Sequence, residues 1–134
     1  MSLYVDTSAL LKRYVEEPDS AAAEQYLLAE PTWITARHTW VEVRRNLSRL
    51  LGGRALSEAR RNFERDWTRT NVVELDEETC EMAATLAEIS GARTLDALHL
   101  AALRRVSENT LPLLSFDIRQ AQAARSLGIT VLGA

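Results

Sequence analysis

The chain has 134 residues, 46% of them hydrophobic, and a net charge of −3, which excludes a disordered or fibrous protein and fits one globular domain over residues 1–134. A single cysteine excludes an internal disulfide, and no apolar run approaches the ~20 residues of a membrane span. We therefore expect a soluble cytoplasmic protein with no membrane partner. The acidic balance argues against a general nucleic-acid binder, which is expected to be basic.

The first half of the chain predicts alternating strands and helices. An apolar run at residues 3–6 is typical of a short strand, and Thr7 or Ser8 can cap a helix that continues to about Tyr14. A second helix is expected from residues 18–20 to Pro31, followed by a strand over 32–35. The next helix is long and ends at Gly52-Gly53, and its apolar face consists of Trp40, Val43, Leu47, Leu50 and Leu51.

The second half continues the alternation. Helices are expected from Ser57 to about Arg69, from a cap at Asp76 to Gly91, from a cap at Thr94 onward, and from Asp117 to Leu127. Strands are expected at residues 72–75, 113–115 and 129–132. Apolar strands separated by helices predict an α/β fold with a parallel sheet covered on both faces.

Four acidic residues stand among apolar ones where a strand or helix begins or ends: Asp6, Glu42, Asp96 and Asp117. An unpaired buried carboxylate is costly, so a group of them requires cations. The ligand crevice of an open parallel sheet lies beyond the C-terminal ends of its strands, where Asp6 and Asp117 are expected. Carboxylate oxygens suit Mg²⁺ or Mn²⁺, and Ser115 adds a hydroxyl. The four acids together predict a site for one or two such ions.

Each acid also has a structural explanation when it is taken alone. Asp6 can begin a turn or cap a helix, although the next two residues already offer caps. Glu42 faces away from the apolar side of its helix and can form an exposed ion pair with Arg45 or Arg49. Asp96 would be the second residue of its helix, and Asp117 also opens one, where the helix dipole favours acids.

Other site types find less support in the sequence. Zinc is not expected, because Cys80, His38 and His99 lie far apart in the chain and lack ligand spacing. His99, one turn after Asp96, is expected to pack or to form a hydrogen bond. The Gly52-Gly53 pair lacks the Lys-Ser/Thr of a phosphate-binding loop.

Basic residues concentrate in one segment of the acidic chain. Residues 37–69 contain nine arginines and four acids, a net charge of +5, whereas the rest of the chain carries −8. Arginine suits phosphate contacts, so we interpret the segment as a local RNA-binding stripe. The alternative is two solvated helix faces. The candidate RNA-binding residues are Arg44, Arg45, Arg49 and, beside Asp96, Arg93.

Four segments in chain order resemble the acidic motifs of PIN-domain nucleases: Asp6-Thr7-Ser8-Ala9-Leu10, Thr39-Trp40-Val41-Glu42-Val43-Arg44, the run from Leu95 through Asp96 to Ala102, and Leu114-Ser115-Phe116-Asp117. Residues 124–132 resemble the family's closing helix and strand. The length resembles that of the VapC toxins of bacterial or archaeal toxin–antitoxin pairs.

This resemblance implies a three-layer α/β/α sandwich with a central, mostly parallel sheet of about five strands. It also implies a Mg²⁺- or Mn²⁺-dependent endoribonuclease that leaves 5′-phosphate and 3′-hydroxyl ends. Asp6, Glu42, Asp96 and Asp117 would be catalytic and hold the metal, with Ser115 and Ser8 in support. The implied partners are an RNA substrate, a cognate antitoxin that covers the active site, and a second copy of the chain. Ser115 stands where many members have threonine, which keeps the hydroxyl.

Two alternatives come from other functional classes. A receiver-like regulatory domain also places acids at strand ends, but it needs adjacent acids near the first strand and a late lysine, and Lys12 is the only lysine. A catalytically inert PIN-like domain would only bind its partner, and the presence of all four acids argues against it. A phosphohydrolase with an aspartate nucleophile would need an acid at position 8, where Ser8 stands.

Overall fold

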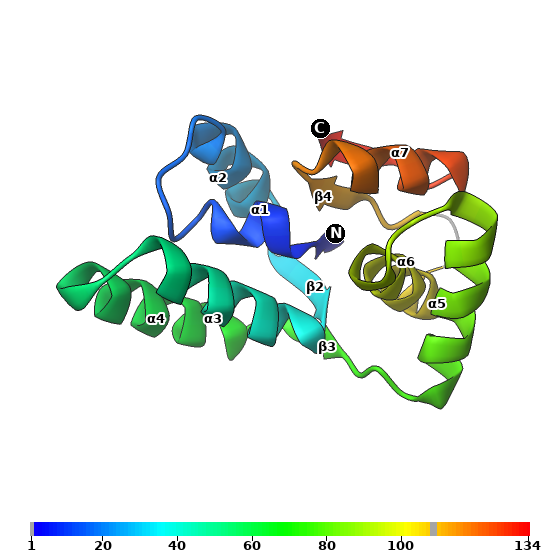
Figure 1. Ribbon diagram of the computed structural model, residues 1–134. Coiled ribbons are helices and arrows are strands. Elements are labelled where there is room, and N and C mark those ends of the chain that lie inside the picture. The colour runs from blue at the N-terminus through cyan, green and yellow to red at the C-terminus, as the bar shows by residue number, and fades with distance from the viewer. Residues whose placement is uncertain (1, 108–109) are drawn as a thin grey trace.

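The computed structural model describes residues 2–107 and 110–134, which form a three-layer α/β/α sandwich (Figure 1). Its central sheet has five strands in the order β3-β2-β1-β4-β5, and every neighbouring pair is parallel. The strands are β1 (Ser2–Val5), β2 (Thr32–Ala36), β3 (Asn71–Val73), β4 (Leu113–Ser115) and β5 (Val131–Gly133). The predicted fold is confirmed.

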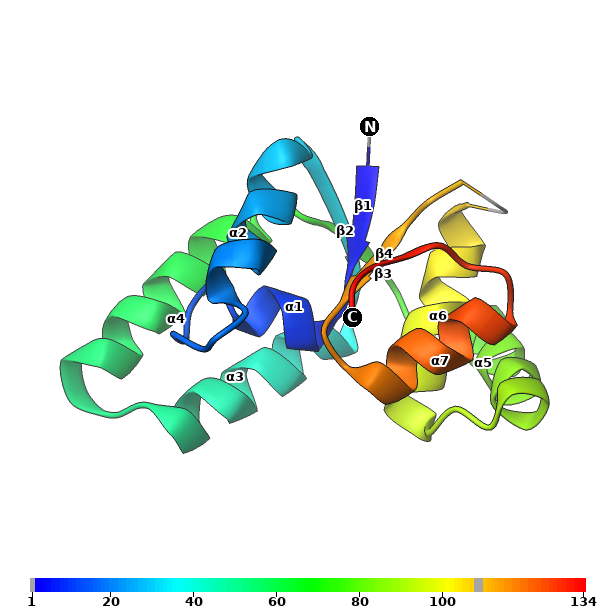
Figure 2. The same ribbon diagram turned by 90° about the horizontal axis from the view of Figure 1, so that it is seen from above.

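Two groups of helices cover the two faces of the sheet (Figure 2). One group consists of α1 (Thr7–Leu11), α2 (Ser20–Ala29), α3 (His38–Leu50) and α4 (Gly53–Trp67). The other consists of α5 (Glu77–Ser90), α6 (Thr94–Val106) and α7 (Ile118–Ser126). Within the described residues, no helix is both long and apolar enough to cross a membrane.

Strand β1 shows how the sequence divides the core between the two faces. Leu3 and Val5 point into the cluster formed with α1–α4, whereas Tyr4 points into the cluster formed with α5–α7. All three side chains are at most 1% exposed, because alternate residues of a central strand face opposite layers. On the α1–α4 side, the rings of Phe63 and Trp67 of α4 pack with their centroids 5.5 Å apart.

Several element boundaries differ from the sequence-based expectation, among them the end of α1, which lies at Leu11 instead of about Tyr14. Helix α4 begins at Gly53 instead of Ser57, because the N–H of Leu56 already bonds to the Gly52 carbonyl, so the glycine pair both ends α3 and opens α4. Strand β3 starts one residue early and ends at Val73. Strand β5 starts at Val131, because the N–H of Ile129 bonds to Ala124 and closes the end of α7.

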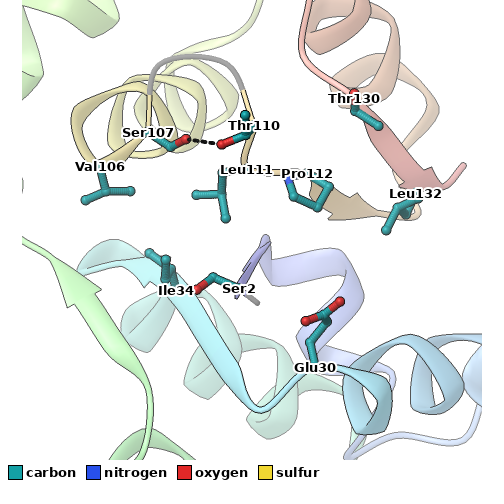
Figure 3. Close-up of a pocket in the computed structure, with 10 residues that line it drawn as sticks. All are labelled: Ser2, Glu30, Ile34, Val106, Ser107, Thr110, Leu111, Pro112, Thr130 and Leu132. Atoms are coloured by element: carbon teal, nitrogen blue, oxygen red, sulfur yellow. Dashed lines mark hydrogen bonds between the residues drawn. The ribbon is translucent and has the colours of Figure 1, made fainter.

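A cavity of about 640 Å³ opens at the edge of the sheet where the strands begin (Figure 3). Ser2 is the first residue of β1, and Pro112 and Thr130 stand directly before β4 and β5. The lining is mainly apolar and hydroxyl-bearing, and Glu30 is the one charged residue among the described residues that line it. The chemistry-bearing acids lie at the opposite edge, where the strands end.

Candidate metal centre and active site

Asp6 and Asp117 approach each other because they follow neighbouring parallel strands. Val5 at the end of β1 pairs in register with Leu114 of β4, and the Asp6 N–H donates to the Leu114 carbonyl over 3.2 Å. The starts of α1, α3 and α7 gather at this edge of the sheet (Figure 2). Both aspartates therefore stand at the edge where ligands bind in open α/β sheets.

Asp6 is the N-cap of α1, so the prediction that Thr7 or Ser8 caps this helix is wrong. Its Oδ1 accepts the N–H of Ala9 over 3.1 Å and the hydroxyl of Ser8 over 2.6 Å. The side chain of Asp6 is 4% exposed, and this burial raises the pKa of its carboxyl although His99, Ser115 and Ser8 act in the opposite direction. The charged form is costly here unless a cation approaches.

Two serines, the buried Ser115 and the half-buried Ser8, hold the segment that leads to Asp117. The Ser115 Oγ accepts the N–H of Asp117 over 3.2 Å and lies 3.4 Å from the Ser8 Oγ, which itself accepts the N–H of Phe116. Asp117 then caps α7 by accepting the N–H groups of two residues of its first turn. Oδ1 of Asp117 thus caps α7, while its Oδ2 contacts Arg93.

Asp96 is the third residue of α6, not the second, because Arg93 instead of Thr94 stands at the N-cap and its carbonyl accepts the N–H of Ala97. Burial raises the pKa of Asp96, and the charges of Asp117 and Asp6 add to this effect. The opposing cation is Arg93, whose guanidinium lies 3.6 Å from Asp96 and 3.8 Å from Asp117. The three aspartates therefore repel one another across a short distance.

Glu42 of α3 points into the molecule instead of pairing with Arg45 or Arg49 at the surface. Its Oε1 accepts the hydroxyl of Thr7 over 2.6 Å and lies 3.2 Å from His99 Nε2. Burial opposes ionisation, but the hydrogen bonds from His99 and Thr7 outweigh it and hold the pKa of Glu42 below its ordinary value. The pKa of Glu42 is therefore shifted in the opposite direction from those of Asp6 and Asp96.

His38 and His99 lie side by side with ring centroids 4.2 Å apart, which overturns the argument that their separation in sequence excludes a shared site. The expectation that His99 forms a hydrogen bond is confirmed, since Tyr4 Oη lies 2.9 Å from its Nδ1. Burial lowers the pKa of His38 to about 4, and the neighbouring His99 adds to the shift. The sequence offered one signal for this cluster, the spacing of four residues between His38 and Glu42 on one helix.

A cleft of about 480 Å³ opens over these groups. Its lining includes Glu42, Asp96 and Asp117 from three different helix starts, together with Arg93. Asp6 is nearly buried, and its charge acts on Asp96 from beneath the cleft. The four predicted acids thus converge. Within the described ranges, however, the one trio of ligand atoms that lies within 4.8 Å comes from Glu42 and the two histidines.

The candidate RNA-binding arginines divide between two faces of α3. Arg45 is exposed and Arg49 bonds to Asn46, whose side chain bonds to the carbonyl of Glu42, so these residues lie on the cleft side. Arg44 instead stacks on Trp40, with its guanidinium 5.3 Å from the ring centroid. The structure therefore groups Arg45 and Arg49 with the acids and separates Arg44 from them.

The family model of the PIN domain matches residues 3–126 of the chain. The chain belongs to the PIN-domain family. This PIN domain is 31% identical to Ribonuclease VapC46 of Mycobacterium tuberculosis over 131 residues, which covers 98% of the chain and 96% of that protein. The predicted family is confirmed.

Solved structures of low sequence identity share the fold of this PIN domain. The sarcin-ricin loop cleaving toxin VapC20 of Mycobacterium tuberculosis superposes with a TM-score of 0.75 at 20% identity, covering 98% of this chain and 99% of that one. A toxin-antitoxin complex from Klebsiella pneumoniae gives 0.68 at 18% identity, with 86% of each chain covered. The roles of individual side chains remain predictions from the geometry.

Proposed function

We propose that this PIN domain is a Mg²⁺- or Mn²⁺-dependent endoribonuclease and the toxin of a toxin–antitoxin pair. The observation that carries the proposal is the convergence of Asp6, Glu42, Asp96 and Asp117 at the C-terminal edge of the sheet. The ribonuclease names of its relatives support the same reaction class. A receiver-like domain is not supported, since the family model matches nearly the whole chain.

The donor set fits a hard divalent cation. Carboxylate oxygens are the ligands that Mg²⁺ and Mn²⁺ prefer. Burial raises the pKa of Asp6, and burial together with the charges of Asp117 and Asp6 raises the pKa of Asp96, so a cation would relieve an electrostatic cost that the fold already bears. When bound, such an ion activates water and neutralises charge on the phosphodiester.

The surrounding side chains hold the acids in place. Thr7 and His99 fix one oxygen of Glu42, and Ser8 fixes one oxygen of Asp6, which leaves the second oxygen of each carboxylate for a ligand. Ser115 accepts the N–H of Asp117 and also lowers the pKa of Asp6 by hydrogen bonding. We therefore assign Ser115 a supporting role at the metal site.

RNA would approach over the cleft from the side of α3. Arg45 and Arg49 share the face of Glu42, and the half-exposed Arg93 lies beside Asp96 and Asp117. A phosphate that enters the cleft can take Arg93 away from the two aspartates while a metal ion takes its place there. This exchange keeps the local charge balanced and gives Arg93 a phosphate to bind.

An antitoxin would cover the same cleft. Each acid on its rim stands next to an exposed apolar side chain: Val41 (64% exposed) precedes Glu42, Leu95 (48%) precedes Asp96, and Ile118 (68%) follows Asp117. An apolar rim around an acidic centre suits a partner segment that carries apolar residues and an arginine. We also retain the homodimer as a proposal from the family resemblance.

Cleavage of total RNA tests the proposed reaction. The purified protein is incubated with RNA in Mn²⁺ or Mg²⁺, and new 5′ ends are mapped, with EDTA and Asp96→Asn as negative controls. Asp76→Asn is the matched control, because Asp76 also stands at a helix start but caps α5 outside the cleft. Cuts with the wild type and Asp76→Asn alone support the proposal. Metal-independent cuts, or cuts retained by Asp96→Asn, contradict it.

A further inference from the structure

Three ligand atoms from two helices point at one spot beside the acidic cleft. His38 Nε2 lies 3.6 Å and His99 Nε2 lies 3.2 Å from the same oxygen, Glu42 Oε1. All three atoms lie within 4.8 Å of one another. Two imidazoles and one carboxylate are the ligand set of many catalytic zinc sites, and differ from the all-oxygen set that Mg²⁺ prefers.

The spacing of these atoms suits a tetrahedral ion. Bonds of about 2.0–2.1 Å at tetrahedral angles place neighbouring ligand atoms roughly 3.4 Å apart. The two nitrogen–oxygen distances to Glu42, 3.2 and 3.6 Å, lie on either side of this value. Small rotations of the rings would therefore complete the triangle around an ion. Glu42 also lines the cleft, from which water can reach this carboxylate.

Buried neighbours prepare the three side chains for this role. The rings of His99 and His38 are 3% and 9% exposed, so their positions are set by packing. Tyr4 Oη lies 2.9 Å from His99 Nδ1. In the tautomer in which it accepts the N–H of Nδ1, Nε2 carries no proton and offers its lone pair to an ion in place of the hydrogen bond to Glu42. His38 Nδ1 is buried and has no hydrogen-bond partner in the described part of the chain. Its Nε2 lies 3.2 Å from the Leu95 carbonyl, so an ion bound at Nε2 would replace that hydrogen bond.

We propose that His38, Glu42 and His99 form a Zn²⁺ site. Its two histidines lie outside the group of four acids, whereas Glu42 belongs to both sites. Zn²⁺ favours imidazole nitrogen, whereas Mg²⁺ is a poor competitor for such a site. If the proposed nuclease function holds, zinc binding withdraws Glu42 from the cleavage metal and inhibits the enzyme. The site would then act as a zinc-dependent brake on RNA cleavage.

Zinc titration calorimetry of tag-free protein tests the site directly. A Cys80→Ser background removes the exposed thiol, the other soft ligand of the described chain. One Zn²⁺ per chain is expected, and His38→Gln or His99→Gln should each raise the Kd by roughly 100-fold or more, since even outer-shell changes cost 10- to 100-fold. Asp96→Asn should leave the zinc Kd unchanged. Co²⁺ should give the visible absorption bands of a tetrahedral site, and these should vanish in both histidine variants.

Folding and activity are read separately. Urea unfolding verifies that each variant is folded, and His38→Gln serves if the more deeply buried His99 does not tolerate substitution. Absence of zinc binding by the folded Cys80→Ser protein overturns the inference, as does binding that neither histidine substitution weakens. Zinc binding at these residues without any RNA cleavage would leave the site standing and refute the nuclease function. Mn²⁺-dependent cleavage without zinc binding would support the nuclease function and refute the zinc site.

Discussion

Nε2 of His99 lies 3.2 Å from Oε1 of Glu42, although 57 residues separate the two in the chain. The other ring nitrogen of His99 lies 2.9 Å from the hydroxyl of Tyr4, in the central strand β1. The imidazole thus joins the core of the sheet to the carboxylate of α3. A change at any of these three residues should be felt at the other two.

Replacement of Tyr4 by phenylalanine should destabilise the protein by about 1–3 kcal/mol, because it leaves a buried ring nitrogen of His99 unpaired. Urea unfolding at neutral pH measures the change. Tyr26→Phe is the matched control, since Tyr26 is 37% exposed and the same atom is removed there. Equal stabilities of the two variants would contradict the role assigned to the Tyr4 hydroxyl.

Asp6→Asn should abolish cleavage while the fold persists. Asparagine caps a helix about as well as aspartate, so the N–H of Ala9 keeps its acceptor. The substitution removes a carboxyl whose burial raises its pKa and makes its charged form costly. The metal-free variant should therefore be at least as stable as the wild type. Cleavage and the urea midpoint are measured on one preparation. A variant that is unfolded, or that still cleaves RNA, contradicts this account.

Without metal, the free energy of unfolding should depend on pH in opposite directions for Asp96 and Glu42, because their pKa values are shifted in opposite directions. The folded pKa of Asp96 lies above its ordinary value of 3.8, so its contribution is fully present below that pH and is lost as the pH rises through the folded pKa. Asp96→Asn should remove this loss. Glu42→Gln should do the opposite, because the pKa of Glu42 is lowered and its contribution is present above 4.5. Urea midpoints measured at pH values below and above 3.8 and 4.5 test both signs. Curves of midpoint against pH that run parallel for the wild type and both variants would refute them.

Substitution of Arg45 and Arg49 by glutamine should weaken RNA binding and flatten its salt dependence, by a slope of about 0.7 for each lost phosphate contact with a single strand. Arg44→Gln should have a smaller effect, because Arg44 stacks on Trp40. Arg61→Gln on α4 controls for net charge. Binding is measured with a cleavage-deficient variant at several salt concentrations. A slope that only Arg44→Gln changes would reverse the assignment of faces.

Local patterns in the sequence were sufficient to predict the parallel sheet and the positions of the four acids. Asp76 and Gly91 cap α5 as expected, because their side-chain and backbone preferences act within one turn. The cap of α1 was predicted at the wrong residue, since Asp6, Thr7 and Ser8 are all good caps and only tertiary contacts choose among them. Thr7 is drawn away to Glu42, which leaves Asp6 to cap the helix.

The histidine cluster was beyond reach of sequence spacing. The rings of His38 on α3 and His99 on α6 lie 4.2 Å apart, and no local pattern in the sequence records that approach. The same holds for Arg44, whose direction is decided by Trp40 and its packing against Phe63. Residue types and their positions along strands were predictable, whereas contacts between distant helices required the structure.

Calorimetric titration with Mn²⁺ tests most directly whether the acids form a metal centre. Wild type, Asp96→Asn and Asp76→Asn are compared in one buffer without zinc. The account predicts Mn²⁺ binding by the wild type and by Asp76→Asn, and a large loss of affinity in Asp96→Asn. Equal Mn²⁺ affinity in all three proteins, or no binding by the wild type, would contradict it.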